Sequence, residues 1–197
     1  PPTGVLPGFG GLELTFATTA LAELTDAVIQ LVTYPYLCAE QRASRVMAVA
    51  ALGDVLAAFD AAGLPDQAEL DEQVREDIEQ LGASQNSDGG WSFWRQDERS
   101  DPYLSVHVTQ ALLLAQQAGA DVPGEVLQRG LAYAADLRRH LNARVPRWPA
   151  PVEHVTRAYG LALLHRAGHD VADSAHDLLR AADIDDWPLD GLGWLLP

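Results

Sequence analysis

One cysteine and one glutamine stand at a spacing at which their side chains could be joined covalently. Cys38 is the only cysteine of the chain, and Gln41 follows it three residues later, where a helical pattern begins. Residues three apart on a helical turn share a face, so the sulfur and the side-chain carbonyl can meet. Bonding them with loss of ammonia would close a small strained ring that holds an activated acyl group. Because a thiolate is a good leaving group, the Gln41 carbonyl carbon would become an electrophile for an amine or a hydroxyl.

Such a bond lasts only where water is excluded, which requires an apolar or aromatic surround. Tyr34, Tyr36 and Leu37 precede the cysteine, and Glu40 lies between the pair. We expect Tyr34 and Tyr36 to supply part of the surround, and a neighbouring domain to supply the rest. The alternative is a small buried cysteine without chemistry, the usual state of a single cysteine. An internal disulfide is excluded, since one cysteine has no partner.

The residues around the pair extend the pattern. Residues 34–41 read Tyr-Pro-Tyr-Leu-Cys-Ala-Glu-Gln, and Ser44-Arg45 follows in the next helical turn. This segment resembles the thioester motif of α2-macroglobulins and complement components, usually Y-P-x-G-C-x-E-Q; bacterial members often continue with Ser-Arg. The resemblance also covers the extended lead-in before the motif, the Gln-Asn-Ser-Asp-Gly-Gly-Trp loop at 85–91 and Asp-Pro-Tyr-Leu at 101–104, and so most of the first two-thirds of the chain.

The chain departs from this motif at Leu37, where the family usually has glycine. If the position requires a positive φ, leucine costs on the order of 1 kcal/mol or more there. Two hypotheses therefore stand. Either the thioester forms, or the chain is a thioester-inactive structural or interaction module of the same family.

The resemblance implies a protease-trapping protein of which this chain is the thioester domain. An attacking protease cleaves a bait segment elsewhere, the change of shape exposes the thioester, and a nucleophile on the protease attacks Gln41 while Cys38 leaves. This is a single covalent capture, so the resemblance implies an inhibitor, not an enzyme, with no cofactor beyond the internal Cys-Gln cross-link. The implied partners are other domains of the same protein and target proteases. Gram-negative relatives are periplasmic and often lipoproteins, so we expect a periplasmic or extracellular location and a monomer.

Two further features bear on which nucleophile would be captured. Relatives that prefer hydroxyl targets place a histidine near the thioester, which makes His107 a candidate acyl-transfer helper. Its helical position is usually aromatic in the family, and a packed or surface histidine is the simpler interpretation, which favours amine targets. All 13 basic residues are arginines. A GC-rich genome explains that bias most simply, but a surface without lysine amines also could not acylate itself.

Helical periodicity dominates after residue 17. Residues 1–17 are expected to be an extended linker from a preceding domain, with a short strand where Leu12, Leu14 and Phe16 alternate with polar residues. Helices are predicted from a cap at 18–19 through 31, and over 39–62, 66–83, 103–118, 124–141, 152–167, 173–182 and 188–196. The fold class is all-α, and residues 18–197 are expected to form one thioester-type helical domain, incomplete at its C-terminal end.

The loop at 85–91 favours a particular all-α architecture. It fits Q-x3-G-x-W and resembles the Gln-Trp repeats of α/α-toroid cyclases, in which the glycines permit unusual backbone conformations and the tryptophan fills the gap between adjacent hairpins. Short loops also make successive helices antiparallel neighbours. We therefore expect stacked antiparallel hairpins in a terpenoid-cyclase-like α/α toroid.

Other functions are excluded by composition and context. A net charge of −15 argues against nucleic-acid binding, and no apolar stretch is long enough to enter a membrane. Residues 183–186 match the D-x-D-D acid motif of terpene cyclases, but the chain is too short for such a cavity and the segment is expected to be a loop before a helix. His165, His169 and His176 do not predict a metal site, because Gly168 breaks the helix that would align the first two.

Overall fold

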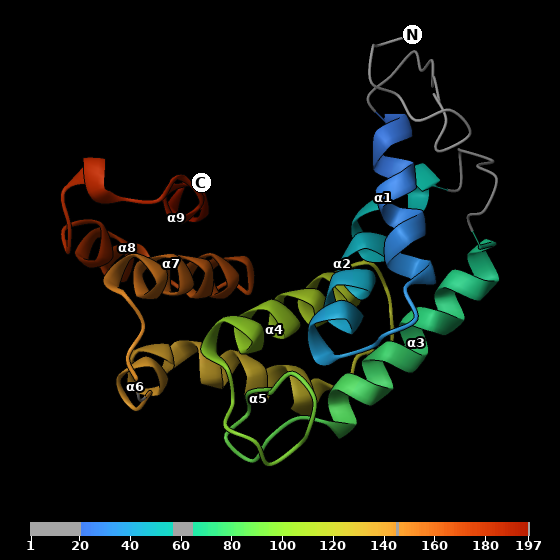
Figure 1. Cartoon of the computed structure of the whole chain (residues 1–197), viewed down its shortest axis with the longest axis horizontal. Helices are drawn as coiled ribbons and strands as arrows, with labels where there is room; N and C mark the ends of the chain where they lie inside the picture. The colour runs from blue at the N-terminus through green and yellow to red at the C-terminus, as the bar shows by residue number, and fades with distance from the viewer. Residues whose placement is uncertain (1–20, 57–64, 145, 197) are drawn as a thin grey trace, which may run out of the picture.

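The computed structural model describes residues 21–56, 65–144 and 146–196, whose regular structure is entirely helical, with no strand among them. In chain order the helices are α1 Leu21–Thr33, α2 Ala39–Leu56, α3 Gln67–Ala83, α4 Pro102–Gln117, α5 Gly124–Ala135, α6 Leu137–Asn142, α7 Ala150–Arg166, α8 Ala172–Leu179, the 3-10 turn η1 Ile184–Asp186 and α9 Leu189–Leu195 (Figure 1). The all-α prediction is confirmed. The strand and linker expected in residues 1–17 lie outside the described residues.

Helix ends follow the local signals in the sequence. α3 begins with a capping box, in which the Asp66 carboxylate accepts from the Glu69 N–H at 2.9 Å and the Glu69 carboxylate accepts from the Asp66 N–H at 3.1 Å. Asp101 caps α4 by accepting from the Leu104 N–H at 3.1 Å. The turns after α4 and α7 contain Gly119 and Gly168, whose φ values of +94° and +90° suit glycine.

One predicted helix is wrong. The segment 124–141 is not continuous but breaks at Asp136 into α5 and α6. α6 buries Leu137 and Leu141, and the Leu137 side chain lies against Gly160 of α7, where an added Cβ would come within 2.7 Å of it. The change of direction therefore brings the two leucines into the core, with Leu137 at a place where α7 has no side chain. Burial overrides a helical pattern that looks unbroken in the sequence.

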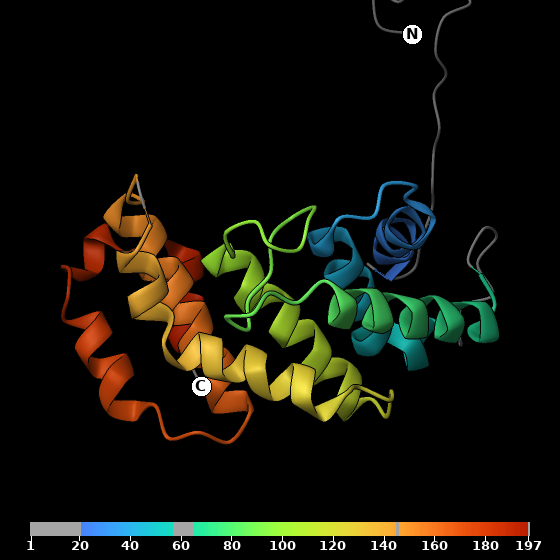
Figure 2. The same cartoon turned by 90° about the horizontal axis from the view of Figure 1, so that it is seen from below.

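Several helices that are not consecutive in the chain pack on one another. α2 packs on α4, α4 on α7 and α7 on α9, while α1 and α3 flank α2, α5 flanks α4 and α7, and α8 flanks α7. α4 lies between the N-terminal helices and the C-terminal ones (Figure 1 and Figure 2). This is the packing of stacked helical hairpins. Closure of these hairpins into an α/α toroid stays a prediction.

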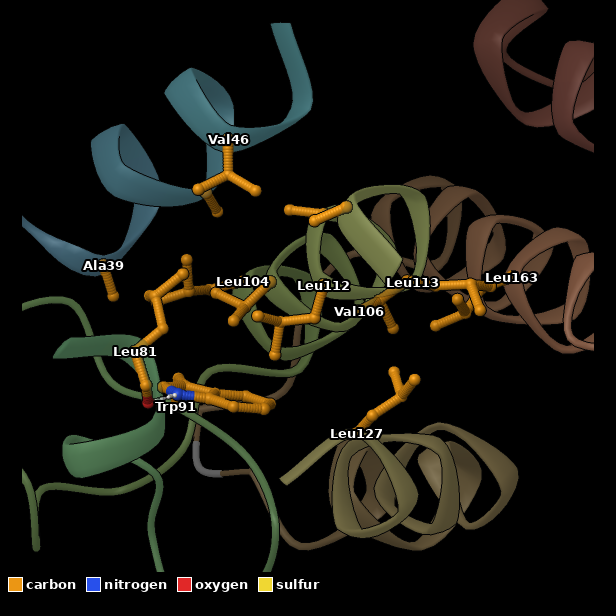
Figure 3. Close-up of a cluster of buried hydrophobic side chains, with 14 of the residues drawn as sticks. Ala39, Val46, Leu81, Trp91, Leu104, Val106, Leu112, Leu113, Leu127 and Leu163 are labelled. Carbon is orange, nitrogen blue, oxygen red and sulfur yellow. Dashed lines mark hydrogen bonds between the residues drawn. The ribbon is translucent and has the colours of Figure 1, made fainter. Parts of the chain in front are cut away.

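Trp91 fills the core where three helices meet. It is completely buried, and its indole N–H donates to the Leu81 carbonyl at the end of α3 at 2.7 Å (Figure 3). Its ring lies against Gly130 of α5, with Leu104 and Leu112 of α4 beside it in Figure 3. The predicted role of this tryptophan, to fill the gap between hairpins, is confirmed.

The loop before Trp91 is held by its own amide side chains. The Gln85 amide donates to the carbonyls of Gly89 at 2.9 Å and Val126 at 3.0 Å, and the Asn86 amide donates to the Glu98 carbonyl at 2.9 Å. Gly89 has a φ of +88°, a conformation that favours glycine. The loop is thus a rigid support for the residues beyond it.

Among the described helices, none combines the length and the apolar character needed to cross a membrane.

Candidate functional site

The structure brings Cys38 and Gln41 together at the first turn of α2. The Cys38 carbonyl accepts the first helical hydrogen bond, from the Arg42 N–H at 3.0 Å, so Cys38 is the residue that caps the helix. Gln41, the third residue of the helix, folds back and accepts a hydrogen bond on Oε1 from the Cys38 N–H at 3.0 Å. This is the returning half of a capping box, in which a glutamine satisfies the amide of the capping residue. The spacing that could form a thioester is also the spacing that starts the helix.

The sulfur side of the pair is enclosed. Cys38 is only 4 % exposed, whereas Gln41 is half-buried. The next residue, Ala39, donates its N–H to the Phe93 carbonyl at 3.1 Å, which fastens the start of α2 to the loop between α3 and α4. That loop follows Trp91, so the rigid Gln85–Trp91 segment supports the helix start.

Leu37 has a backbone conformation open to any residue. Among the described residues that are not glycine, Asp97 alone has a positive φ. The cost of leucine at a positive φ therefore does not arise for Leu37 in this conformation. Its side chain is half-buried beside the cysteine.

The tyrosines expected around the cysteine face outward in this chain. Tyr34 is 45 % exposed and Tyr36 is 67 % exposed, and their rings meet edge to face with centroids 5.8 Å apart. Phe93 and Trp94 are also exposed, on the loop that binds the start of α2. We call these four residues the aromatic surface. Cys38 is buried although both tyrosines are exposed, so the aromatic surface is left available for contact.

Glu40 and His107 are connected through Ser44. The Ser44 hydroxyl lies 2.8 Å from Glu40 Oε1 and 3.0 Å from His107 Nε2, and His107 Nδ1 lies 3.3 Å from the Tyr159 hydroxyl. Because Ser44 gives its one proton to the carboxylate, its oxygen accepts from the Nε2–H of His107. Nδ1 then carries no proton and accepts from Tyr159. The four side chains form a directional hydrogen-bond chain from α7 through α4 to α2, which we call the relay chain.

The electrostatics of the relay chain agree with this assignment. Burial lowers the pKa of His107 below its ordinary value, and the nearby Glu40 carboxylate opposes part of that effect. Burial likewise raises the pKa of Tyr159. A neutral imidazole and a protonated phenol are the forms that the hydrogen bonds require. His107 is half-buried, and both of its ring nitrogens are engaged, one with Ser44 and one with Tyr159.

Sequence reasoning missed a buried acid beneath the site. Asp77 of α3 is completely buried and pairs with Arg42 and Arg45, which follow Gln41 on α2. One signal was present: Asp77 falls on the apolar stripe of its helix, between Val74 and Leu81. An acid in such a stripe indicates a buried ion pair. Its partners could not be read from the spacing, because they lie more than thirty residues away.

The remaining motifs are not brought into the site. Residues 184–186 form the exposed turn η1, which carries no enclosed acid. Within the part of the chain that the structure describes, no group of three or more histidine, cysteine or acidic residues is arranged to hold a metal ion.

Fold and site together define an all-α domain with an N-capping cysteine hydrogen-bonded, through its own amide, to a glutamine. Alpha-2-macroglobulin of Thermotoga maritima is 33 % identical over 139 residues, which are 70 % of this chain and 8 % of that protein. Alpha-2-macroglobulin of Rickettsia conorii is 27 % identical over 141 residues, 71 % of this chain and 7 % of that protein. No family model matches the chain.

Solved structures share the fold. The native conformation of Escherichia coli alpha-2-macroglobulin aligns with a TM-score of 0.70 at 20 % identity, over 87 % of this chain and 11 % of that one. Salmonella alpha-2-macroglobulin reacted with methylamine aligns with a TM-score of 0.66 at 18 % identity, over 80 % of this chain and 10 % of that one. The chain is an alpha-2-macroglobulin-like domain, and it spans less than a tenth of the length of the two curated relatives.

Proposed function

We propose that this chain is the thioester-bearing domain of a bacterial α2-macroglobulin-like protease inhibitor. The observation that carries the proposal is the hydrogen bond from the Cys38 N–H to Gln41 Oε1 at 3.0 Å, which holds the glutamine carbonyl next to the only cysteine. The chain corresponds to a small part of its relatives, so trapping belongs to the full-length protein and the covalent step belongs to this domain.

This geometry supports the formation of a thioester in two steps. The Cys38 thiol adds to the Gln41 Cδ atom, and negative charge develops on Oε1. The Cys38 N–H already donates to that oxygen, as an oxyanion-stabilising donor must. The C–N bond then breaks, and the amide nitrogen leaves as ammonia with the proton that the thiol supplied. The product is a thioester between Cys38 and Gln41.

In the capture step the Cys38 sulfur, which attacked Gln41 during ring formation, becomes the leaving group. A primary amine attacks Cδ, the C–S bond breaks, and the sulfur leaves as a thiol with a proton from the amine, so an amide joins Gln41 to the attacking molecule. Two fold neighbours support the comparison: one is Salmonella alpha-2-macroglobulin reacted with methylamine, the other is trypsin-activated alpha-2-macroglobulin from Escherichia coli. In the full-length protein the amine would come from the attacking protease.

The relay chain favours an amine over a hydroxyl as the acceptor. Both ring nitrogens of His107 are engaged, one with Ser44 and one with Tyr159, so the imidazole is not presented as a base for a weakly nucleophilic hydroxyl. An amine attacks without such help. The chain itself has no lysine, so an activated thioester cannot react with an ε-amine of its own domain.

The aromatic surface would provide the barrier to water. Exposed aromatic side chains around a reactive bond are expected to be covered by another part of the protein, and Tyr34, Tyr36, Phe93 and Trp94 lie on the segments that form the site. We propose that another domain covers them until a protease cleaves the bait segment. The full-length protein would act as a monomer in the periplasm or outside the cell, where attacking proteases occur, with a lipid anchor outside this chain.

Intact mass of the full-length protein tests the proposal. A thioester lowers the mass by one ammonia, and methylamine should convert the deficit into an added methylamine with the appearance of one titratable thiol. Full mass with a thiol that titrates from the start would favour the second candidate, a thioester-inactive module. The observation that favours this second candidate is leucine at position 37, where the family motif has glycine.

A further inference from the structure

A buried carboxylate lies beneath the first turn of α2. Asp77 is 0 % exposed, and a buried carboxylate is costly unless it is paired and hydrogen-bonded. Arg45 binds it with two nitrogens, Nε to Oδ2 at 2.6 Å and Nη2 to Oδ1 at 2.8 Å. Arg42 Nη1 adds a third hydrogen bond, to Oδ1 at 2.6 Å. Asp77 is therefore fully satisfied by two residues of one neighbouring helix.

The two arginines connect Asp77 to both ends of the segment from Val32 to Arg42, which carries the reactive pair. Arg42 follows Gln41 directly, and its backbone N–H makes the first helical hydrogen bond, to the Cys38 carbonyl at 3.0 Å. Arg45 extends the other way and donates from Nη1 to the Val32 carbonyl in the last turn of α1 at 3.4 Å. The loop from α1 to Cys38 thus has both ends connected to one carboxylate.

We propose that Asp77 is a positioning residue for the Cys38–Gln41 reaction, an inference that rests on the proposed thioester function. The planar guanidinium of Arg45 donates two hydrogen bonds to a carboxylate in only one orientation, so the bidentate pair fixes the rotation of α2 and its position along its axis against α3. Ring closure needs the sulfur and the carbonyl carbon within reacting distance and angle, and displacement of about 1 Å can slow such a step by orders of magnitude. Asp77 acts through Arg42 and Arg45 and touches neither reacting group.

A purely structural role makes a different prediction. If Asp77 only stabilised the packing of α2 on α3, its loss would lower the unfolding temperature but leave ring closure complete in molecules that are folded. If Asp77 positions the reactive pair, folded molecules of the variant would still lack the thioester. The fraction of folded protein that carries the ammonia deficit separates the two roles.

The test compares Asp77→Asn with a matched control in the full-length protein. The substituted asparagine would keep the shape of the side chain and remove its charge, while Glu72→Gln makes the same chemical change in the exposed Arg75–Glu72 pair of the same helix. Circular dichroism and thermal unfolding fix a temperature at which every variant is folded. At that temperature we expect the wild type and Glu72→Gln to carry the ammonia deficit, and folded Asp77→Asn to show at least about a tenfold smaller fraction with the deficit.

A second variant keeps the test decisive if Asp77→Asn does not fold. Arg45→Lys preserves the charge pair and removes the bidentate fork, and we expect it to fold with a reduced thioester fraction. A full ammonia deficit in folded Asp77→Asn, or in Arg45→Lys where Asp77→Asn is unfolded, would overturn the positioning role. Absence of the deficit from the wild type would instead contradict the proposed function itself, so the two failures are distinguishable.

Discussion

The Cys38 N–H and the Gln41 side-chain oxygen are 3.0 Å apart, and this one hydrogen bond both caps α2 and holds together the two residues of the proposed thioester. A capping box needs a residue at the helix start and a glutamine or glutamate three residues later. A cysteine at the start turns the same geometry into a thiol beside an amide carbonyl. The helix cap uses the Cys38 backbone amide and the Gln41 side chain, and the proposed chemistry uses the Cys38 thiol and the same Gln41 side chain.

Replacing Gln41 by glutamate should separate the cap from the chemistry. A carboxylate can still accept from the Cys38 N–H, and a negative charge is favourable at a helix N-terminus, but it offers no ammonia to lose. We expect Gln41→Glu to unfold at the same denaturant concentration as the wild type or a slightly higher one, with a thiol that titrates without methylamine. Gln41→Ala, which loses the cap, should be about 1 kcal/mol less stable in urea unfolding. Equal stability of the two variants would contradict the capping role.

Leu37→Gly tests whether the departure from the family motif matters. Leu37 does not have a positive φ, so glycine relieves no strain and instead adds conformational freedom to the unfolded chain. We expect a loss of about 0.5–1 kcal/mol in urea unfolding and no gain in the fraction of full-length protein with the ammonia deficit. A clear gain in that fraction would mean that leucine impairs ring closure.

Trp91 should be the most costly aromatic residue to remove from the loop between α3 and α4. It is completely buried and donates to the Leu81 carbonyl, so Trp91→Ala should cost about 3–5 kcal/mol in urea unfolding of the chain. Trp94, three residues later, is 71 % exposed, and Trp94→Ala should change stability by less than about 0.5 kcal/mol. Similar losses for both would contradict the assignment of Trp91 to the core.

Stability should fall as the pH is lowered through the range in which histidine titrates. The folded-state pKa of His107 is lowered by burial from its ordinary value of about 6.5, so the unfolded chain takes up a proton before the folded one does. The stabilisation is fully present above pH 6.5 and is lost progressively as the pH falls from there towards the lower folded pKa. His140 is also lowered by burial and contributes in the same direction.

A variant of His107 tests whether this residue causes the effect. His107→Gln should flatten the dependence of the unfolding free energy on pH as the pH falls below about 6.5. Urea unfolding at a series of pH values gives the slopes. An unchanged slope in His107→Gln would show that the imidazole is not held neutral by the relay chain.

The sequence predicted those parts of the fold that depend on local signals. The predicted helices 66–83 and 103–118 agree with α3 and α4 to within one residue at each end, because the hydrogen bonds at a helix end involve residues a few positions apart. The break at Asp136 escaped prediction, because its cause is the burial of Leu137 against Gly160, a contact between distant segments. Local pattern predicts where a helix can form, and packing decides where it bends.

The same distinction between local and long-range contacts applies to the candidate site. The pairing of Cys38 with Gln41 follows from spacing, whereas the Arg45–Asp77 pair and the Ser44–His107 contact join residues 32 and 63 positions apart. The exposure of Tyr34 and Tyr36 could not be predicted either, because the surround expected for a thioester includes atoms from outside this chain.

The most direct test of the central claim is peptide mass spectrometry of the full-length protein treated with isotope-labelled methylamine and then iodoacetamide under native conditions. The account predicts one labelled methylamide on Gln41 and one alkyl group on Cys38, in equal amounts, and neither modification at these residues when methylamine is omitted. A Gln41 that carries no label after methylamine treatment, or alkylation of Cys38 without methylamine, would contradict it.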